Sequence, residues 1–155
     1  MRIRLISILA LATCAAVFAE EPFAGTWKLN LAKSKYAPGM APKEATAVLR
    51  EVAGGQVEQT VSGVGPDGKP IAVKQTVSQA GGVWKFQQGG PPPGEMRAAL
   101  KISPREFYNV TYIGEKQVSY THSTLSADGK TFVHTVKGVN PQGKPFENTA
   151  VFERQ

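Results

Sequence analysis

A recurring turn motif, x-[Pro/Ala]-[Asp/Gln]-Gly-Lys, constrains the fold of this chain more than any other feature. It occurs at residues 65–69, 126–130 and 140–144. A preset first corner, a polar second corner and a glycine free to take positive φ are typical of a type I turn closed by a G1 bulge. Each such turn joins two antiparallel strands, so the motif predicts at least three β-hairpins. Turn chemistry alone accounts for the likeness between 60–71 and 135–146, without gene duplication.

Short segments of alternating apolar and polar residues fill the chain between turns rich in Gly, Pro and Asp. This rhythm predicts an all-β barrel or sandwich. We expect little or no helix, because the best helical candidate, 94–101, is short. Irregular loops are expected at 31–44 and 87–94. The expected strands number about ten and lie near 23–30, 45–52, 56–64, 70–78, 83–87, 97–102, 106–113, 116–126, 130–140 and 144–154.

The turns also predict which side chains face the interior, because the turn type fixes the strand register. With a three-residue loop at each motif, His122 opposes His134 and Val136 opposes Asn148. The face expected to point inward carries Val118, Tyr120, His122, Phe132, His134, Val136, Phe146, Asn148, Ala150 and Phe152. In the first repeat it carries Val57, Gln59, Val61, Ile71, Val73, Gln75 and Val77.

The N-terminus resembles a secretion signal. Arg2 and Arg4 precede an apolar run, and a small-residue pattern predicts cleavage after residue 19. The alternative is a lipid anchor at Cys14, since Leu11-Ala12-Thr13-Cys14 approximates a lipoprotein box. Residues 20–155 are expected to form one secreted or periplasmic domain. They hold 16 basic and 12 acidic residues, scattered singly, which does not indicate nucleic-acid binding.

Both ends of the predicted domain resemble the calycin superfamily of lipocalins and fatty-acid-binding proteins. The opening segment is Phe23-Ala24-Gly25-Thr26-Trp27-Lys28-Leu29, and the last strand ends Val151-Phe152-Glu153-Arg154. The resemblance implies a single antiparallel up-and-down barrel in which Trp27 closes the base beneath the Arg154 side chain. The chain is also similar to secreted bacterial lipocalin-like proteins that open with Gly-Thr-Trp-Lys-Leu-Asn. No activity transfers from those.

The chain departs from fatty-acid-binding proteins at the residues that hold the ligand. Their last strand carries an Arg-x-Tyr clasp for the carboxylate, and the matching positions here are Ala150 and Phe152. Without that cation, a carboxylate would be buried unpaired at a high cost. The segment 31–44 is also too short for the two helices of that family. We therefore expect a calycin-like shell whose ligand is not a fatty-acid anion.

The inward face supplies the candidate site. We expect a small, mainly apolar ligand to contact Tyr120, His122, Phe132, His134, Val136, Phe146 and Asn148. Directly opposed residues have Cβ atoms about 5 Å apart, so His122 and His134 would also be close enough to share a metal or haem iron. Two ligands alone do not close a metal site, and the alternative is that both histidines are interior polar groups.

Three functional hypotheses follow. The first is a barrel that binds a small ligand, the second is a protein-interaction or inhibitor module with a filled barrel, and the third is a metal- or haem-dependent activity at the two histidines. Residues 20–155 contain no Cys, no Gly-x-Ser-x-Gly, no phosphate-binding glycine loop and no His-Glu-x-x-His. We therefore expect binding rather than catalysis, and no cofactor.

Overall fold

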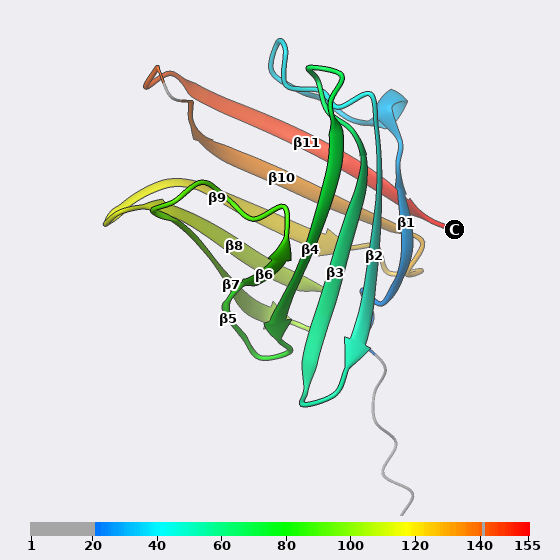
Figure 1. Ribbon diagram of the computed structural model, residues 1–155. Helices are drawn as coiled ribbons and strands as arrows, with labels where there is room; N and C mark the ends of the chain where they lie inside the picture. Colours follow the sequence, from blue (N-terminus) through cyan, green and yellow to red (C-terminus); the bar gives the residue numbers. More distant parts are fainter. Residues whose placement is uncertain (1–20, 141) are drawn as a thin grey trace, which may run out of the picture.

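The chain forms one antiparallel sheet that curls into a nearly closed barrel (Figure 1). The computed structural model describes residues 21–140 and 142–155, so the predicted signal peptide and the alternative anchor at Cys14 lie outside the described residues. The all-β, calycin-like prediction is confirmed, with eleven strands rather than about ten. They are β1 Gly25–Leu29, β2 Glu44–Val52, β3 Gln56–Val64, β4 Pro70–Ser78, β5 Gly81–Val83, β6 Lys85–Gln88, β7 Glu95–Ser103, β8 Glu106–Ile113, β9 Lys116–Leu125, β10 Thr131–Val139 and β11 Pro145–Arg154.

The extra strand arises where the barrel closes. The strand order is β5-β7-β8-β9-β10-β11-β1-β2-β3-β4-β6. β5 pairs with β7 and β6 pairs with β4, so the short segment that contains both strands crosses from one end of the sheet to the other. Trp84 lies at the crossing and donates its backbone N–H to the Arg97 carbonyl, 2.9 Å away. Closure removes most of the exposed sheet edge.

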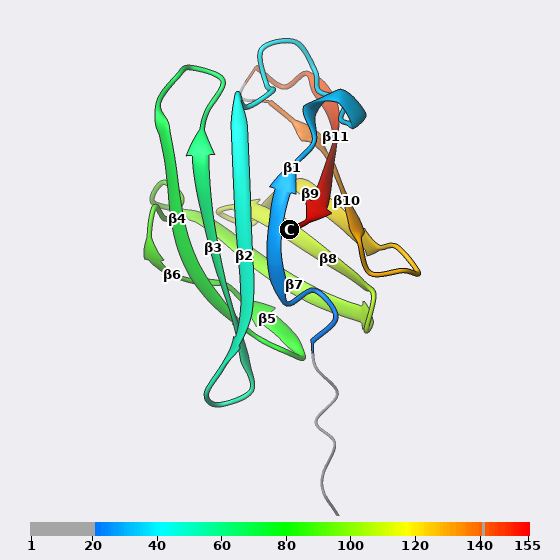
Figure 2. The same cartoon turned by 90° about the vertical axis from the view of Figure 1, so that its right-hand side faces the viewer.

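The barrel has two walls that face each other. In Figure 1 strands β2, β3 and β4 stand in front of β7 to β11, whose direction crosses theirs at a large angle. Figure 2 shows β1 lying beside both β2 and β11, so that β1 joins the two walls. Among the described residues, no helix has the length and apolar character needed to cross a membrane. Within residues 21–140 and 142–155, the one helical element is the short 3₁₀ turn η1, Leu31–Lys33.

The predicted register is confirmed for two of the three motif turns. Gly65 pairs with Lys69 and Asn140 with Lys144, as a three-residue loop requires. The pairs Val136–Asn148 and Phe132–Phe152 follow from the second of these loops. In the first repeat, Val57 opposes Val77 and both are buried.

The prediction for the third motif turn was wrong by one residue. The Ser126 amide donates to the Thr131 carbonyl rather than to that of Lys130, so the loop contains four residues. The Lys130 carbonyl instead accepts from the backbone N–H of Arg154 at 2.9 Å. A slip of one residue reverses every side chain of a strand. Thr121, Ser123 and Leu125 therefore face inward on β9, and Tyr120 and His122 face outward.

An aromatic cluster closes the base of the barrel. Phe23 lies edge-on to Phe107 at 4.9 Å between ring centroids, and Trp27 lies edge-on to Phe132 at 5.1 Å. Phe152 stacks on Phe132 at 4.8 Å. Edge-to-face and offset-stacked rings contribute about 0.5–1.5 kcal/mol per pair beyond the burial of their area. We call these five residues the aromatic plug.

Arg154 covers the plug from outside and explains the Gly-x-Trp motif. Its guanidinium lies over the Trp27 ring, 4.2 Å from the centroid. It also donates to the backbone carbonyls of Gly129, Ala24 and Pro22. Gly25 has φ of +137°, and a Cβ atom there would meet the Arg154 guanidinium. The glycine is therefore needed both for its backbone angle and for the space that Arg154 occupies.

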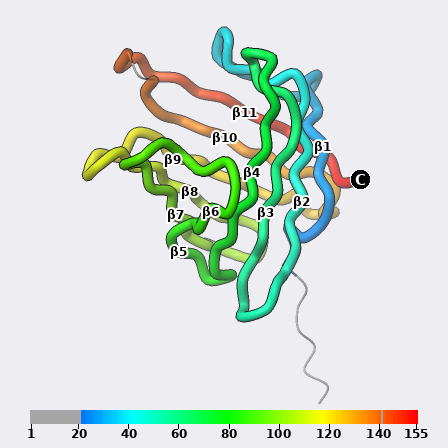
Figure 3. Tube along the Cα trace, in the orientation of Figure 1, coloured from blue at the N-terminus to red at the C-terminus, as the bar shows by residue number. Residues whose placement is uncertain are grey.

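The loop between β1 and β2 packs along β11 rather than along β2. The backbone of Lys35 exchanges two hydrogen bonds with Thr149, at 2.6 and 2.7 Å. The side chain of buried Asn148 accepts from the Ala37 amide at 2.8 Å. Residues 34–43 thus cover the β11 side of the barrel mouth. The turns that join β3 to β4, β8 to β9 and β10 to β11 border the rest of the mouth (Figure 3).

We expect Trp27→Ala to lower the free energy of unfolding by about 3–5 kcal/mol, because it removes a fully buried ring from the aromatic plug. Urea denaturation measures the change. Lys28→Ala is the matched control, since Lys28 is exposed on the same strand and should change stability by less than about 0.5 kcal/mol. Equal stabilities for the two variants would contradict this account of the base.

Candidate functional site

A cavity of about 850 Å³ lies above the aromatic plug and extends to the mouth. Its floor is formed by Phe23, Phe107 and Phe132. Its rim includes Ile113 and Val139, which are 54% and 39% exposed. Ligand pockets in proteins typically measure about 300–1,000 Å³. The cavity is therefore large enough for a small organic ligand.

The wall formed by β2, β3 and β4 is mainly apolar. Ala47, Val61 and Val73 lie side by side across the three strands and line the cavity. The polar exceptions are Gln59 and Gln75, which oppose each other and share a hydrogen bond from Gln75 Nε2 to Gln59 Oε1. Gln75 Oε1 is buried and has no partner among the described residues. The pair thus makes one hydrogen bond and leaves a buried amide oxygen without a partner among the described residues.

The opposite wall, formed by β7, β8 and β9, is polar. Thr111 and Ser119 oppose each other, and Asn109 opposes Thr121 in the next inward row. All four line the cavity. The hydroxyls of Thr111, Ser119 and Thr121 bond to no other described side chain or backbone group. None of the three is fully buried, so each remains accessible. Three hydroxyl groups are therefore open to the cavity contents.

Three charged residues line the cavity, and all lie near the mouth. Arg97 on β7 pairs with Glu95, with Arg97 Nη2 and Nε at 2.7 and 2.8 Å from Glu95 Oε1. The Arg97 guanidinium also lies 5.6 Å from the centroid of the Phe86 ring. Lys116 on β9 is exposed and pairs with no acidic group among the described residues. The cavity lining therefore carries one more positive than negative charge.

Trp84 anchors the closing segment to the polar wall. Its indole N–H donates to Asn109 Oδ1 at 2.8 Å. Deeper in the barrel, Lys101 pairs with the buried Glu21 at 2.6 Å. Lys101 is therefore already neutralised and does not line the cavity. Both contacts are long-range, so they depend on the complete barrel.

His134 is a neutral interior group. It lines the cavity, and its Nδ1 lies 2.7 Å from the hydroxyl of the fully buried Ser123. Burial inside the barrel lowers the pKa of His134 from 6.5 to about 4. The ring therefore presents a hydrogen-bonding edge without a charge at neutral pH.

His122 lies on the other side of the sheet. Its Nε2 is 2.7 Å from Glu106 Oε1, and its ring stacks on Tyr108 at 4.4 Å. The prediction that His122 and His134 face each other inside the barrel was therefore wrong, because the four-residue loop shifts β9 by one position. Within the described ranges, no group of three or more His, Cys, Asp or Glu residues is placed to hold a metal ion.

The structure divides the other predicted ligand-binding residues. Phe132, His134 and Val136 line the cavity together. Tyr120 faces outward with His122 and is 37% exposed. Phe146 and Asn148 do not line the cavity, and Asn148 instead holds the 34–43 loop.

Arg97, Asn109 and the hydroxyls of the polar wall were not predicted from the sequence. On β7 the alternation misleads, because Met96, Leu100 and Ile102 point outward and are 43%, 60% and 52% exposed. Glu95 and Arg97 on the same strand point inward and line the cavity. Residues 95–103 do alternate between apolar and polar side chains. The usual interpretation of that alternation places the apolar side chains inside the barrel, which is the reverse of their orientation in the structure.

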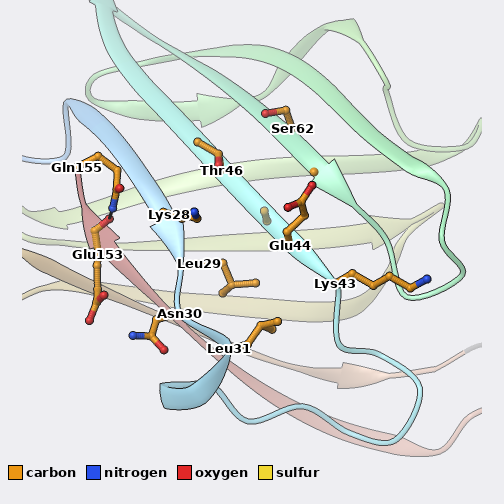
Figure 4. A pocket seen from close by; sticks show the side chains of 12 residues that line it. Lys28, Leu29, Asn30, Leu31, Lys43, Glu44, Thr46, Ser62, Glu153 and Gln155 are labelled. Atoms are coloured by element: carbon orange, nitrogen blue, oxygen red, sulfur yellow. Dashed lines mark hydrogen bonds between the residues drawn. The ribbon is translucent and has the colours of Figure 1, made fainter.

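A second hollow lies where β1 leaves β2 (Figure 4). Leu29, Asn30 and Leu31 border one side and Lys43 and Glu44 the other, around about 700 Å³. Half of its lining residues are exposed, and two lysines are balanced by two glutamates. It lacks the enclosure that a ligand site needs, so the interior cavity is the candidate site.

Comparisons with known proteins agree on the fold. No protein-family model matches the chain, and no curated protein matches its sequence. Its structure is similar to the fluorescent protein UnaG, with a TM-score of 0.58 and 15% identity over 87% of this chain and 98% of that one. It is also similar to EF1p2_mFAP2b bound to DFHBI, with a TM-score of 0.51 and 12% identity over 86% of this chain and 94% of that one. At these identities the likeness shows the fold, which is a calycin-like β-barrel.

His134 should make stability depend on pH. Between pH 6.5 and about 4 the unfolded chain binds a proton at this ring and the folded chain does not, so stability falls as the pH falls. We expect wild type to lose about 2 kcal/mol more than His134→Gln between pH 7 and pH 5. Urea denaturation at both values measures this difference. Parallel losses in the two proteins would contradict the interior placement of a neutral His134.

Proposed function

We propose that this protein is a secreted or periplasmic barrel that binds a small, mainly apolar ligand in its interior. The observation that carries the proposal is the cavity of about 850 Å³ between the aromatic plug and the mouth. It combines an apolar wall with a few polar groups, which is the usual composition of ligand sites. Phe132, His134 and Val136 contribute to it from β10. The structure of EF1p2_mFAP2b contains bound DFHBI, which supports small-molecule binding by a barrel of this fold.

A protein-interaction role is the second candidate, and the outer face of the barrel favours it. Met96, Leu100 and Ile102 on β7 are exposed on the same outer face as Tyr120 on β9, with β8 between them. Contiguous exposed apolar surface often marks a protein contact. The open cavity argues against a barrel filled by its own side chains. The metal-dependent alternative lacks support, since His122 and His134 lie on opposite faces.

Filling the cavity should abolish ligand binding. We expect Val136→Trp to weaken binding of phenylnaphthylamine, an uncharged fluorescent probe, by about tenfold or more, because the indole would occupy the space beside the polar wall. Fluorescence titration of the purified protein measures the affinity.

The control uses the same substitution on the same strand. Val133 lies on the outer face of β10, so Val133→Trp should leave probe binding unchanged. Circular dichroism and urea denaturation establish that both variants are folded. The proposal fails if folded wild-type protein binds no probe, or if the two tryptophan variants bind it equally well.

A further inference from the structure

We propose that the mouth of the barrel holds the anionic group of its ligand, between Arg97 and Lys116, while the ligand body lies in the cavity. The ligand class is thus a small organic anion with one hydrogen-bonding edge. This inference rests on the proposed function, because it requires that the cavity binds a ligand. It adds the position of the charge and the orientation of the ligand.

Arg97 and Lys116 lie on the same inner wall near the rim, on β7 and β9, with β8 between them. Glu95 on β7 opposes Ile113 on β8, which in turn opposes Lys116 on β9. The two outer strands of this trio are about 10 Å apart, since neighbouring strands are separated by about 4.8 Å. Arg97 lies one inward row deeper on β7. A sulfonate or carboxylate at the rim would therefore lie between Arg97 and Lys116, which line the same cavity.

Glu95 neutralises only one of these cations. Its contact with Arg97 uses a single carboxylate oxygen and two of the guanidinium nitrogens. The third guanidinium nitrogen, Nη1, has no partner among the described residues. The Arg97 guanidinium also lies over the Phe86 ring, within cation–π distance. One negative charge on a ligand would bring the net charge of the cavity lining to zero.

The polar wall continues inward from this cation pair. Thr111 and Ser119 share the row of Arg97, and Thr121 follows in the next row. Their free hydroxyls form a strip along one side of the cavity. The opposite wall offers Ala47, Val61 and Val73. A ligand that fits both walls has an apolar face, a polar edge and a charge at the end nearest the mouth.

This position differs from the carboxylate clasp that the sequence lacks. Ala150 and Phe152 stand where fatty-acid-binding proteins carry that clasp, deep in the barrel on the last strand. The cations here lie at the other end of the cavity, on β7 and β9. An anion at the mouth remains partly hydrated and costs less to desolvate than one buried at the base. An anion at the mouth is therefore compatible with the lack of a carboxylate clasp at Ala150 and Phe152.

Two probes that differ by one charge test the proposal. Anilinonaphthalene sulfonate carries a sulfonate that its uncharged analogue phenylnaphthylamine lacks. We expect Lys116→Gln to weaken binding of the anionic probe by about tenfold, as the loss of a charged hydrogen-bond partner does, and to leave the uncharged probe unaffected. Glu95→Gln should strengthen binding of the anionic probe, because it frees Arg97.

A gain of affinity in one variant and a loss in the other cannot result from misfolding. Lys28→Gln is the charge-matched control, since Lys28 is exposed on the outside of β1 and should change neither affinity. If both probes bind inside the barrel, as shown by loss of binding in Val136→Trp, but Glu95 and Lys116 variants bind them as wild type does, the anion site is refuted alone. If Val136→Trp blocks neither probe, the proposed function fails with it.

Discussion

The contact between Arg154 and Trp27 is the interaction on which the barrel depends. It brings the last strand over the first, and the Arg154 guanidinium ties three backbone carbonyls from two separate segments to that point. The same contact requires a glycine at position 25, because a Cβ atom there would meet the Arg154 guanidinium. The closure of the base therefore depends on one arginine.

A plug confined to the base leaves the rest of the interior open. The aromatic side chains come from β1, β8, β10, β11 and the segment before β1, and all lie near one end. Towards the mouth, small and β-branched residues replace them on one wall and hydroxyl groups on the other. This gradient from large to small side chains produces the cavity. Its two unlike walls are the reason to expect an amphipathic ligand rather than a purely apolar one.

Much of the fold could be predicted from the sequence, because local turn chemistry encodes it. The turns at 65–69 and 140–144 close as their residues require, and the strands they join have the predicted register. The turn at 126–131 could not be predicted in this way, since the Lys130 carbonyl pairs with the backbone of β11 and the hairpin closes one residue later, at Thr131. The site was predicted only where the register was correct. Phe132, His134 and Val136 line the cavity, whereas Tyr120 and His122 do not. On β7 the apolar residues face outward, which no local pattern indicates.

Native mass spectrometry of the protein purified from its own host tests most directly whether the cavity holds a ligand. The account predicts a small organic molecule bound in one copy to wild type and to Val133→Trp, released as an anion on activation, and absent from Val136→Trp. A protein that carries no bound molecule under gentle ionisation in any of the three forms, or one that retains the same molecule in Val136→Trp, would contradict it.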